Sequence, residues 1–152
     1  FLKKFLNIKF KKNTKFLCID PSIKESEVNK KYLNSKNIMN IKNYVAPTYS
    51  KNNIFDKKLI KLIKDFKPNY IIINLGGETQ EILGLYIKTS IKFKTSILCT
   101  GAAIAFLTKS QAPINDTIDK FYMGWLLRTI YNPREYFLRI LKSLYLIKYF
   151  LK

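Results

Sequence analysis

Polar residues and glycines directly follow three short apolar runs of the sequence. Asp20 follows the first run, Gly76 and Gly77 follow the second, and Gly101 follows the third. In open parallel sheets, ligands bind beyond the carboxyl ends of the strands. If the three runs are strands of one such sheet, these residues form the rim of a binding site. The alternative is that each of them only permits a tight turn.

The sequence contains no histidine. This excludes Ser-His-Asp and Cys-His catalysis and His-ligated zinc, so any proton transfer must use a carboxylate, a lysine, a tyrosine or a partner. The two cysteines, Cys18 and Cys99, are far apart and each lies in an apolar run. Neither a disulfide framework nor a metal site follows from that spacing. We expect both to be reduced thiols that fill strand positions, and we expect no metal.

Strand and helix patterns alternate along the chain. The expected strands are 15–19, 41–45, 70–75 and 96–100, and the expected helices are 23–33, 53–66, 78–88, 118–130 and a last one from Pro133 onward. Ser22 and Asn53 are the expected N-caps of the first two helices. The runs at 70–75 and 96–100 show no alternation, which indicates strands buried on both faces. The pattern predicts an α/β fold, a Rossmann-like parallel sheet with flanking helices and a C-terminal helical appendage.

The chain carries 28 Lys and Arg residues against 10 Asp and Glu residues, a formal net charge of +18. Such an excess favours anionic partners, namely nucleic acid, an anionic membrane surface or phosphorylated substrates. The alternative is compositional drift, because Lys, Asn, Ile, Phe and Tyr are all abundant. A nucleic-acid-binding module is the least favoured interpretation, since the aromatic residues mostly occupy periodic apolar positions and no recognisable motif is present.

A series of short motifs runs in order from Phe66 to Arg139. A helix ending in Lys-Pro and an apolar run lead to L-G-G-E-T-Q-E at 75–81; F-L at 106–107, A-P at 112–113, G-W-L-L-R at 124–128 and N-P-R at 132–134 follow. The series resembles that of the WecB/TagA/CpsF glycosyltransferases (glycosyltransferase family 26). In that family a strand leads to G-x-P-x-Q-E, followed by G-G-x-F-D, R-A-P, G-L-E-W-L-Y-R and E-P-x-R. The resemblance covers about half of the chain.

The resemblance implies a bacterial transferase that moves an N-acetylmannosamine-type sugar from a UDP donor to a polyprenyl-diphosphate-linked acceptor. Such enzymes act in cell-surface polysaccharide synthesis, need no cofactor, and work as cytoplasmic proteins on the inner face of the cell membrane. Matched by position, the substrate-binding residues are Gly76, Gly77, Gln80 and Glu81, with Gly101 at the next strand end.

Three arginines of the matched motifs, Arg128, Arg134 and Arg139, belong by resemblance to a C-terminal appendage that contacts the diphosphate or the membrane. Guanidinium groups suit phosphate oxygens and the charge that develops on a diphosphate leaving group. The helix expected after Pro133 carries apolar residues on one face and basic residues on the other, which is typical of an interfacial amphipathic helix. The alternative is a terminal helix packed on its own domain. We therefore divide the chain into an α/β domain at 1–131 and a basic amphipathic tail at 132–152.

The chain departs from the family pattern at several positions. Thr79 stands where the family has proline, Ala102 where it has the second glycine, Ala105 where it has aspartate, and Gly124 where it has glutamate. The family's catalytic aspartate lies in an N-terminal half that we expect this chain to lack, so no catalytic residue is assigned. The resemblance thus leaves two interpretations open: an active glycosyltransferase, if the chain is complete or complemented, and an inactive or truncated membrane-peripheral homologue.

Overall fold

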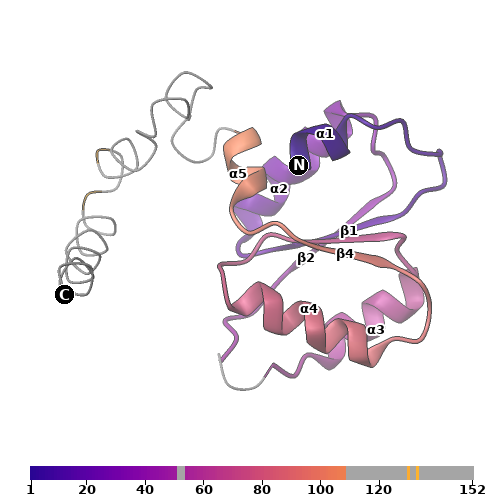
Figure 1. The fold of residues 1–152 in the computed structure, drawn as a ribbon, viewed down its shortest axis with the longest axis vertical. Helices are drawn as coiled ribbons and strands as arrows, with labels where there is room; N and C mark the ends of the chain where they lie inside the picture. The colour runs from indigo at the N-terminus through magenta and orange to yellow at the C-terminus, as the bar shows by residue number, and fades with distance from the viewer. Residues whose placement is uncertain (51–53, 109–129, 131–132, 134–152) are drawn as a thin grey trace, which may run out of the picture. The chain divides into compact units, whose positions relative to one another are not determined.

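The computed structural model describes residues 1–50, 54–108, 130 and 133. The chain divides into two units, Phe1–Ser110 and Gln111–Lys152, and the fold below is that of the first. Its described elements alternate between helix and strand (Figure 1). In chain order they are α1 (Leu2–Leu6), β1 (Phe16–Asp20), α2 (Ile23–Ser35), β2 (Ile41–Val45), α3 (Lys57–Phe66), β3 (Tyr70–Ile73), α4 (Thr79–Ser90), β4 (Ser96–Cys99) and α5 (Ala103–Leu107).

The four strands form one parallel sheet in the order β2-β1-β3-β4. Phe16 pairs with Ile41 on one side and with Tyr70 on the other, and Tyr70 pairs with Ser96. The predicted Rossmann-like α/β fold is therefore confirmed. The chain passes from β1 outward to β2 and then crosses back to β3 on the other side of β1. In such sheets the crevice at this reversal, here between β1 and β3, is the usual ligand site.

Helices α3 and α4 cover one face of the sheet, whereas α1, α2 and α5 lie on the other (Figure 1). The first face is aliphatic, because α3 turns Leu59, Ile60 and Ile63 toward the sheet at helical spacing and α4 adds Leu83 and Ile87. This burial of apolar surface is the main stabilising contribution to the layer. The lysines of α3 are left on its outer side.

The second face is packed around the side chains of Phe16, Cys18 and Ile72, which are all fully buried. The short helix α1, which the sequence analysis did not predict, adds Leu2 and Leu6 to this core. The other unpredicted helix, α5, adds Ile104 and Ala105 as buried residues. Both helices have only five residues. Isolated helices of that length are marginal in water, so tertiary packing must hold them.

Two expectations about the helix starts had different outcomes. Ser22 caps α2 as predicted, since its Oγ accepts a hydrogen bond from the Glu25 N–H at 3.2 Å. The cap predicted for α3 at Asn53 is wrong. The helix begins at Lys57 with Asp56 as N-cap, because the Asp56 carboxylate accepts a hydrogen bond from the Leu59 N–H at 2.9 Å. Phe55, whose spacing suggested an apolar helix position, precedes the helix and is 67% exposed.

Strand β4 differs from the expectation that both of its faces are buried. It lies at the edge of the sheet, Ile97 and Leu98 are half-buried, and Ser96 and Cys99 are exposed. Both cysteines are free and occupy strand positions, as predicted, but Cys18 is buried in β1 whereas Cys99 is exposed at the end of β4. The helices predicted at 118–130 and from Pro133 onward lie outside the described residues, apart from Ile130 and Pro133. The boundary predicted between 131 and 132 lies outside them as well.

Candidate functional site

The carboxyl edge of the sheet brings together most of the residues that the sequence analysis singled out. Parallel strands all end at the same edge, so Asp20 after β1, the loop at 74–78 after β3, and Thr100 with Gly101 after β4 converge there. The loop and Gly101 are held together by Gln80. Asp20 is directed into a separate, buried cluster. The edge therefore has an open part and a closed part, which have different chemistry.

The open part is the loop between β3 and α4. Gly76 and Gly77 are exposed, and a Cβ atom added to either residue would meet nothing within 4 Å. The residue with a positive φ in this loop is Glu78, at 71°, and not one of the glycines. Packing therefore does not require glycine at 76 or 77. What these glycines provide is bare backbone that a ligand can approach closely.

Helix α4 begins at Thr79, directly after this bare loop. Its N-cap residue, Glu78, makes no side-chain hydrogen bond to the first turn. The first N–H groups of a helix have no partner within the helix, although here the Gln80 N–H donates to the Gly76 carbonyl at 3.2 Å, and the helix dipole adds partial positive charge at this end. A helix start preceded by exposed glycines can therefore accept an anionic group such as a phosphate.

Gln80 connects the first turn of α4 to the turn that follows β4. Its Oε1 accepts a hydrogen bond from the Gly101 N–H at 2.7 Å, and its Nε2 donates one to Glu81 Oε1 at 2.7 Å. Gly101 has φ +53°, a left-handed conformation that favours glycine. Three residues that were predicted from resemblance to lie at one pocket are thus in direct contact. In this structure, the amide of Gln80 positions the two loops.

The closed part is built around Asp20, which is fully buried. Its Oδ1 accepts hydrogen bonds from the side-chain amides of Asn29 and Asn74, both at 2.7 Å, and its Oδ2 accepts one from Asn43 at 3.0 Å. Thr100 Oγ1 donates to Asn74 Oδ1 at 2.9 Å, which extends the cluster to β4. The expectation that Asp20 belongs to the rim is therefore wrong, because its carboxylate is closed off by amides. These amides were not predicted from the sequence, although Asn74 directly follows an apolar strand.

A second buried carboxylate, Asp56, lies at the start of α3, near the end of β2. The hydroxyls of Tyr44 and Tyr49 each donate to Asp56 Oδ2 at 2.7 Å, and the Asp56 N–H donates to Tyr86 Oη at 3.2 Å. Burial raises the pKa of Asp56, but the hydrogen bonds from the Leu59 N–H and the two tyrosines outweigh it and lower the pKa. Burial and the hydrogen bond to Asp56 raise the pKa of Tyr44 and Tyr49 well above the usual value. This cluster was not predicted from the sequence.

The sequence matches the glycosyl transferase WecG/TagA/CpsF family over residues 24–152, which is most of the chain. The chain belongs to this family. No curated protein and no solved structure matches it. Membership places the chain among glycosyltransferases of cell-surface polysaccharide synthesis.

The matched span of the WecG/TagA/CpsF family includes the whole open part of the edge. Gly76, Gln80 and Gly101 lie inside it, whereas Asp20 precedes its first residue. The three arginines predicted to contact diphosphate or membrane, Arg128, Arg134 and Arg139, also lie within the span but outside the described residues. They are the only arginines of the sequence, so every basic side chain in the described part is a lysine.

Among the residues that the structure describes, no group of three or more Asp, Glu and Cys side chains is placed to hold a metal ion. No helix among the described residues is long and apolar enough to cross a membrane.

Proposed function

We propose that this family member transfers an N-acetylmannosamine-type sugar from a UDP donor to a polyprenyl-diphosphate-linked acceptor. The donor site of this proposal consists of Gly76, Gly77, Gln80, Glu81 and Gly101. Family membership supports a sugar-nucleotide donor and a lipid-linked acceptor in general terms. The particular sugar, nucleotide and lipid are proposals that come from the resemblance of the motifs.

One observation carries the donor site: α4 starts without a side-chain cap directly after two exposed glycines. In the proposed complex, the donor diphosphate lies against the N–H groups at the start of this helix. The glycines allow the close approach, and the helix dipole favours the negative charge. Gln80 fixes the distance between this helix start and the Gly101 turn, so that both sides of the donor site are held in place before binding. Such preorganisation lowers the cost of binding.

Departure of UDP in this reaction develops negative charge on the diphosphate as the bond to the sugar breaks. Backbone N–H groups and guanidinium groups both stabilise such charge. We assign the guanidinium part to Arg128, Arg134 and Arg139 by position in the motifs. In the same proposal the tail at 132–152 contacts the inner face of the cell membrane through its basic and apolar residues. The protein would then meet its acceptor at the bilayer surface.

A second candidate is a family member that binds the donor without transferring the sugar. Two observations favour it. The Asp20 carboxylate is closed off by three amides, so it is not placed to accept a proton from an acceptor hydroxyl. Ala105, which stands at the position of the family's aspartate, is a buried residue of the short helix α5. Under this alternative the donor site persists and the catalytic base is absent.

Calorimetry and a transfer assay on the full chain distinguish the two candidates. The transferase proposal expects UDP to bind and UDP to be released when UDP-N-acetylmannosamine and a polyprenyl-diphosphate-linked acceptor are both present. The binding-only alternative expects the same UDP affinity with no acceptor-dependent release. If UDP does not bind at all, both candidates are rejected. Lys88→Ala, an exposed change on α4 away from the loop, serves as the control for general effects of substitution.

A further inference from the structure

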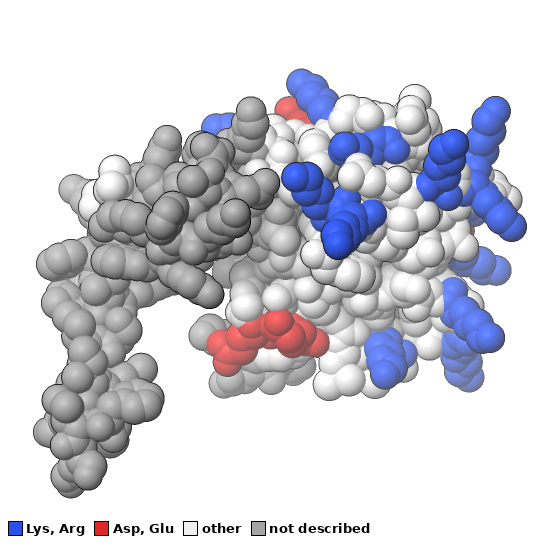
Figure 2. Space-filling view, turned by 45° about the horizontal axis from the view of Figure 1, so that its top comes forward, with Lys and Arg blue, Asp and Glu red and all other residues white. Residues whose placement is uncertain are grey.

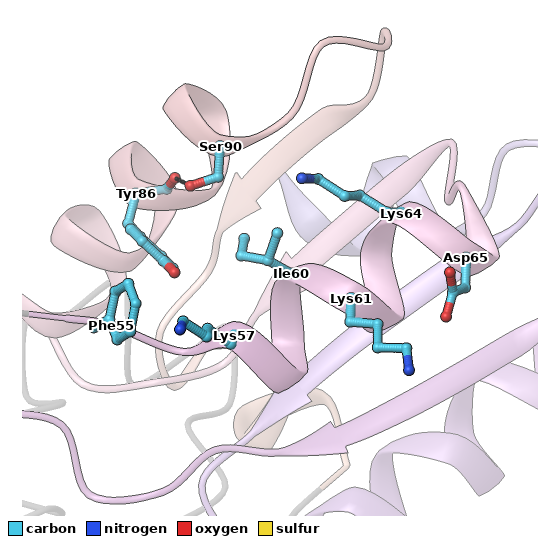
Figure 3. Close-up of a pocket in the computed structure, with 8 residues that line it drawn as sticks. All are labelled: Phe55, Lys57, Ile60, Lys61, Lys64, Asp65, Tyr86 and Ser90. Carbon is cyan, nitrogen blue, oxygen red and sulfur yellow. Dashed lines mark hydrogen bonds between the residues drawn. The ribbon is translucent and has the colours of Figure 1, made fainter.

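A groove of about 510 Å³ lies beside helix α3, on the outer surface of the aliphatic face of the sheet. Ile60 of α3 lies beneath it, and Tyr86 of α4 and Phe55 stand at its side (Figure 3). Three lysines of α3, Lys57, Lys61 and Lys64, also line it. We call this set of six residues the basic groove. It shares no residue with the open loop, Gln80 or Gly101.

The helical pattern of α3 places these lysines at the surface. Its apolar residues are buried against the sheet, so the basic residues between them are exposed. In Figure 3 the ammonium groups of Lys61 and Lys64 make no hydrogen bond to the other labelled residues. Asp65 is the only acidic residue in the lining. The lining therefore carries a net positive charge that its own side chains do not neutralise.

Phe55 gives the basic groove an apolar tip. Its side chain is 67% exposed, the Lys57 ammonium lies 5.3 Å from the centre of its ring, and its ring centroid lies 6.5 Å from that of Tyr86. Exposing such a large ring in water has no evident benefit to the fold of the described residues. An aromatic ring surrounded by lysines is the arrangement by which peripheral proteins reach the boundary between headgroups and acyl chains.

The direction of α3 relates the basic groove to the candidate donor site. The helix follows β2 and leads back to the start of β3, and these strands are parallel, so α3 begins at the carboxyl edge of the sheet. Phe55 and Lys57 therefore lie at the same edge as the open loop. A flat surface that contacts the groove at this end would lie close to the edge at which the donor is proposed to bind.

We infer that the basic groove is a docking surface for the anionic phospholipid headgroups of a bilayer, separate from the tail at 132–152. The inference rests on the proposed function in one respect, since a lipid-linked acceptor requires the protein to work at a membrane. Lysine stems can lie over the apolar floor while their ammonium groups reach the phosphates. A single-stranded nucleic acid fits less well, because its bases need a series of open aromatic faces, and of the two rings in the lining only Phe55 is largely exposed.

The test is sedimentation of the full chain with phosphatidylcholine vesicles that contain phosphatidylglycerol, compared with pure phosphatidylcholine vesicles. The groove variant is Lys57→Glu, Lys61→Glu and Lys64→Glu. The control variant is Lys24→Glu, Lys30→Glu and Lys31→Glu, three exposed lysines of α2 on the other face of the sheet. Both variants change the net charge equally. Each basic residue near an anionic surface contributes about fivefold to partitioning, so loss of three lysines weakens binding roughly a hundredfold, and the added repulsion of three glutamates makes this a lower limit for the groove variant.

The control variant should retain binding to within about tenfold of the unchanged chain, because only long-range attraction is reduced. Phe55→Ser should weaken binding without changing the charge. If the groove variant does not fold by circular dichroism, Lys61→Gln with Lys64→Gln replaces it, and a decrease of at least about tenfold is expected. An equal loss of vesicle binding in the groove and control variants would show that only the net charge matters, and would overturn the inference. Undiminished binding by a folded groove variant would overturn it too.

Three further experiments distinguish this inference from the alternatives. Arg134→Glu with Arg139→Glu tests the tail, and its loss should add to that of the groove variant if the two surfaces are separate. If the groove variant loses binding to a single-stranded oligonucleotide but keeps binding to vesicles, the groove is a nucleic-acid surface and the inference fails. UDP affinity should be equal in the groove variant and the unchanged chain. If UDP does not bind, but the groove variant still binds anionic vesicles more weakly than the control variant, the proposed donor site is wrong and the docking surface remains supported.

Discussion

The two halves of the carboxyl edge use polar residues in opposite ways. In the half formed by β1 and β2, Asp20 and Asp56 are buried and accept hydrogen bonds from amides, tyrosines and a backbone N–H. In the half formed by β3 and β4, Gly76 and Gly77 leave the backbone exposed and α4 has no side-chain cap. In Figure 2 most of the acidic side chains in view form one patch, a further one lies at the top beside basic side chains, and the basic ones are spread over the rest of the described surface.

The difference indicates where stability and binding reside. A buried polar group with all of its partners contributes to a unique fold, and removing one partner is costly. An exposed loop before a helix without a side-chain cap contributes little to the free energy of unfolding, and its bare backbone remains accessible to a ligand. We therefore expect substitutions in the first half to change stability and substitutions in the second half to change UDP binding.

The largest effect is expected for Asp20→Ala. The substitution leaves the amides of Asn29, Asn43 and Asn74 without their acceptor in a buried site, and should lower the free energy of unfolding by about 3–5 kcal/mol. Urea denaturation monitored by circular dichroism measures it. Asp20→Asn keeps the volume and one acceptor oxygen, so it should cost about half as much. A loss below about 1 kcal/mol for Asp20→Ala would remove the distinction between the two halves.

Asp56→Ala should come next, with a loss of about 2–3 kcal/mol, because the helix cap and both tyrosine hydrogen bonds disappear. The pKa of Asp56 is lowered in the folded state, so its carboxylate contributes stability that is complete above the unfolded pKa of about 4. This contribution is lost as the pH falls through the lower folded pKa. Denaturation of the unchanged chain and of Asp56→Asn across this range should show their difference shrinking toward acid. A constant difference would contradict the role of the charge.

Gln80→Ala probes the half formed by β3 and β4, because Gln80 joins the open loop after β3 to Gly101 after β4. UDP binding should weaken by roughly 1–3 kcal/mol, the usual cost of a lost buried hydrogen-bond partner, as isothermal calorimetry can measure. The free energy of unfolding should fall by less than about 1 kcal/mol, since the side chain is only half-buried. Lys88→Ala is the matched control on the same helix. Unchanged UDP affinity in Gln80→Ala would place the donor elsewhere.

The smallest effects come from a pair of glycine substitutions. Gly101→Ala places a side chain at φ +53° and should cost about 1 kcal/mol of stability. Gly77→Ala meets no neighbouring atom, so its stability should stay within about 0.5 kcal/mol of the unchanged chain while UDP affinity falls. Thermal unfolding and calorimetry on both variants decide this. Equal stability losses would show that the two glycines have the same structural role.

Strands β1, β3 and β4 were predictable from sequence because they are short apolar runs that lead to aspartate or glycine, and β2 is a weaker run that ends before Pro47. Helix α2 was predictable because Ser22 and Glu25 have the spacing of a cap. The start of α3 was not, since Phe55 continues the apolar spacing of the helix but points to the surface. The edge position of β4 was not predictable either, because Ser96–Cys99 is as apolar as a central strand and only strand order distinguishes the two.

In the candidate site, too, some features were predictable from the sequence and others were not. Gly76, Gly77 and Gly101 were found because turns after strands have a recognisable composition. The hydrogen bond between Gln80 and Gly101 joins residues 21 positions apart, and the one between Asn74 and Asp20 joins residues 54 positions apart. Such pairs depend on strand order and on side-chain direction, which local patterns do not contain. A single aspartate at a strand end has the same sequence signal whether it faces a ligand or a cluster of amides.

The hydrogen bonds around Asp20 connect the strands in their spatial order, from Asn43 on β2 through Asp20 on β1 and Asn74 after β3 to Thr100 after β4. One strand cannot leave this edge without breaking one of these hydrogen bonds to the next, the central one of which is buried. Partial opening of the sheet from its carboxyl end is thereby penalised, so its amide protons should exchange with deuterium mainly through unfolding of the whole sheet. Fast exchange at the exposed glycine loop would accompany slow exchange in the strands beside it. Strands that exchange slowly and a glycine loop whose backbone is always in contact with solvent would then lie within a few residues of each other.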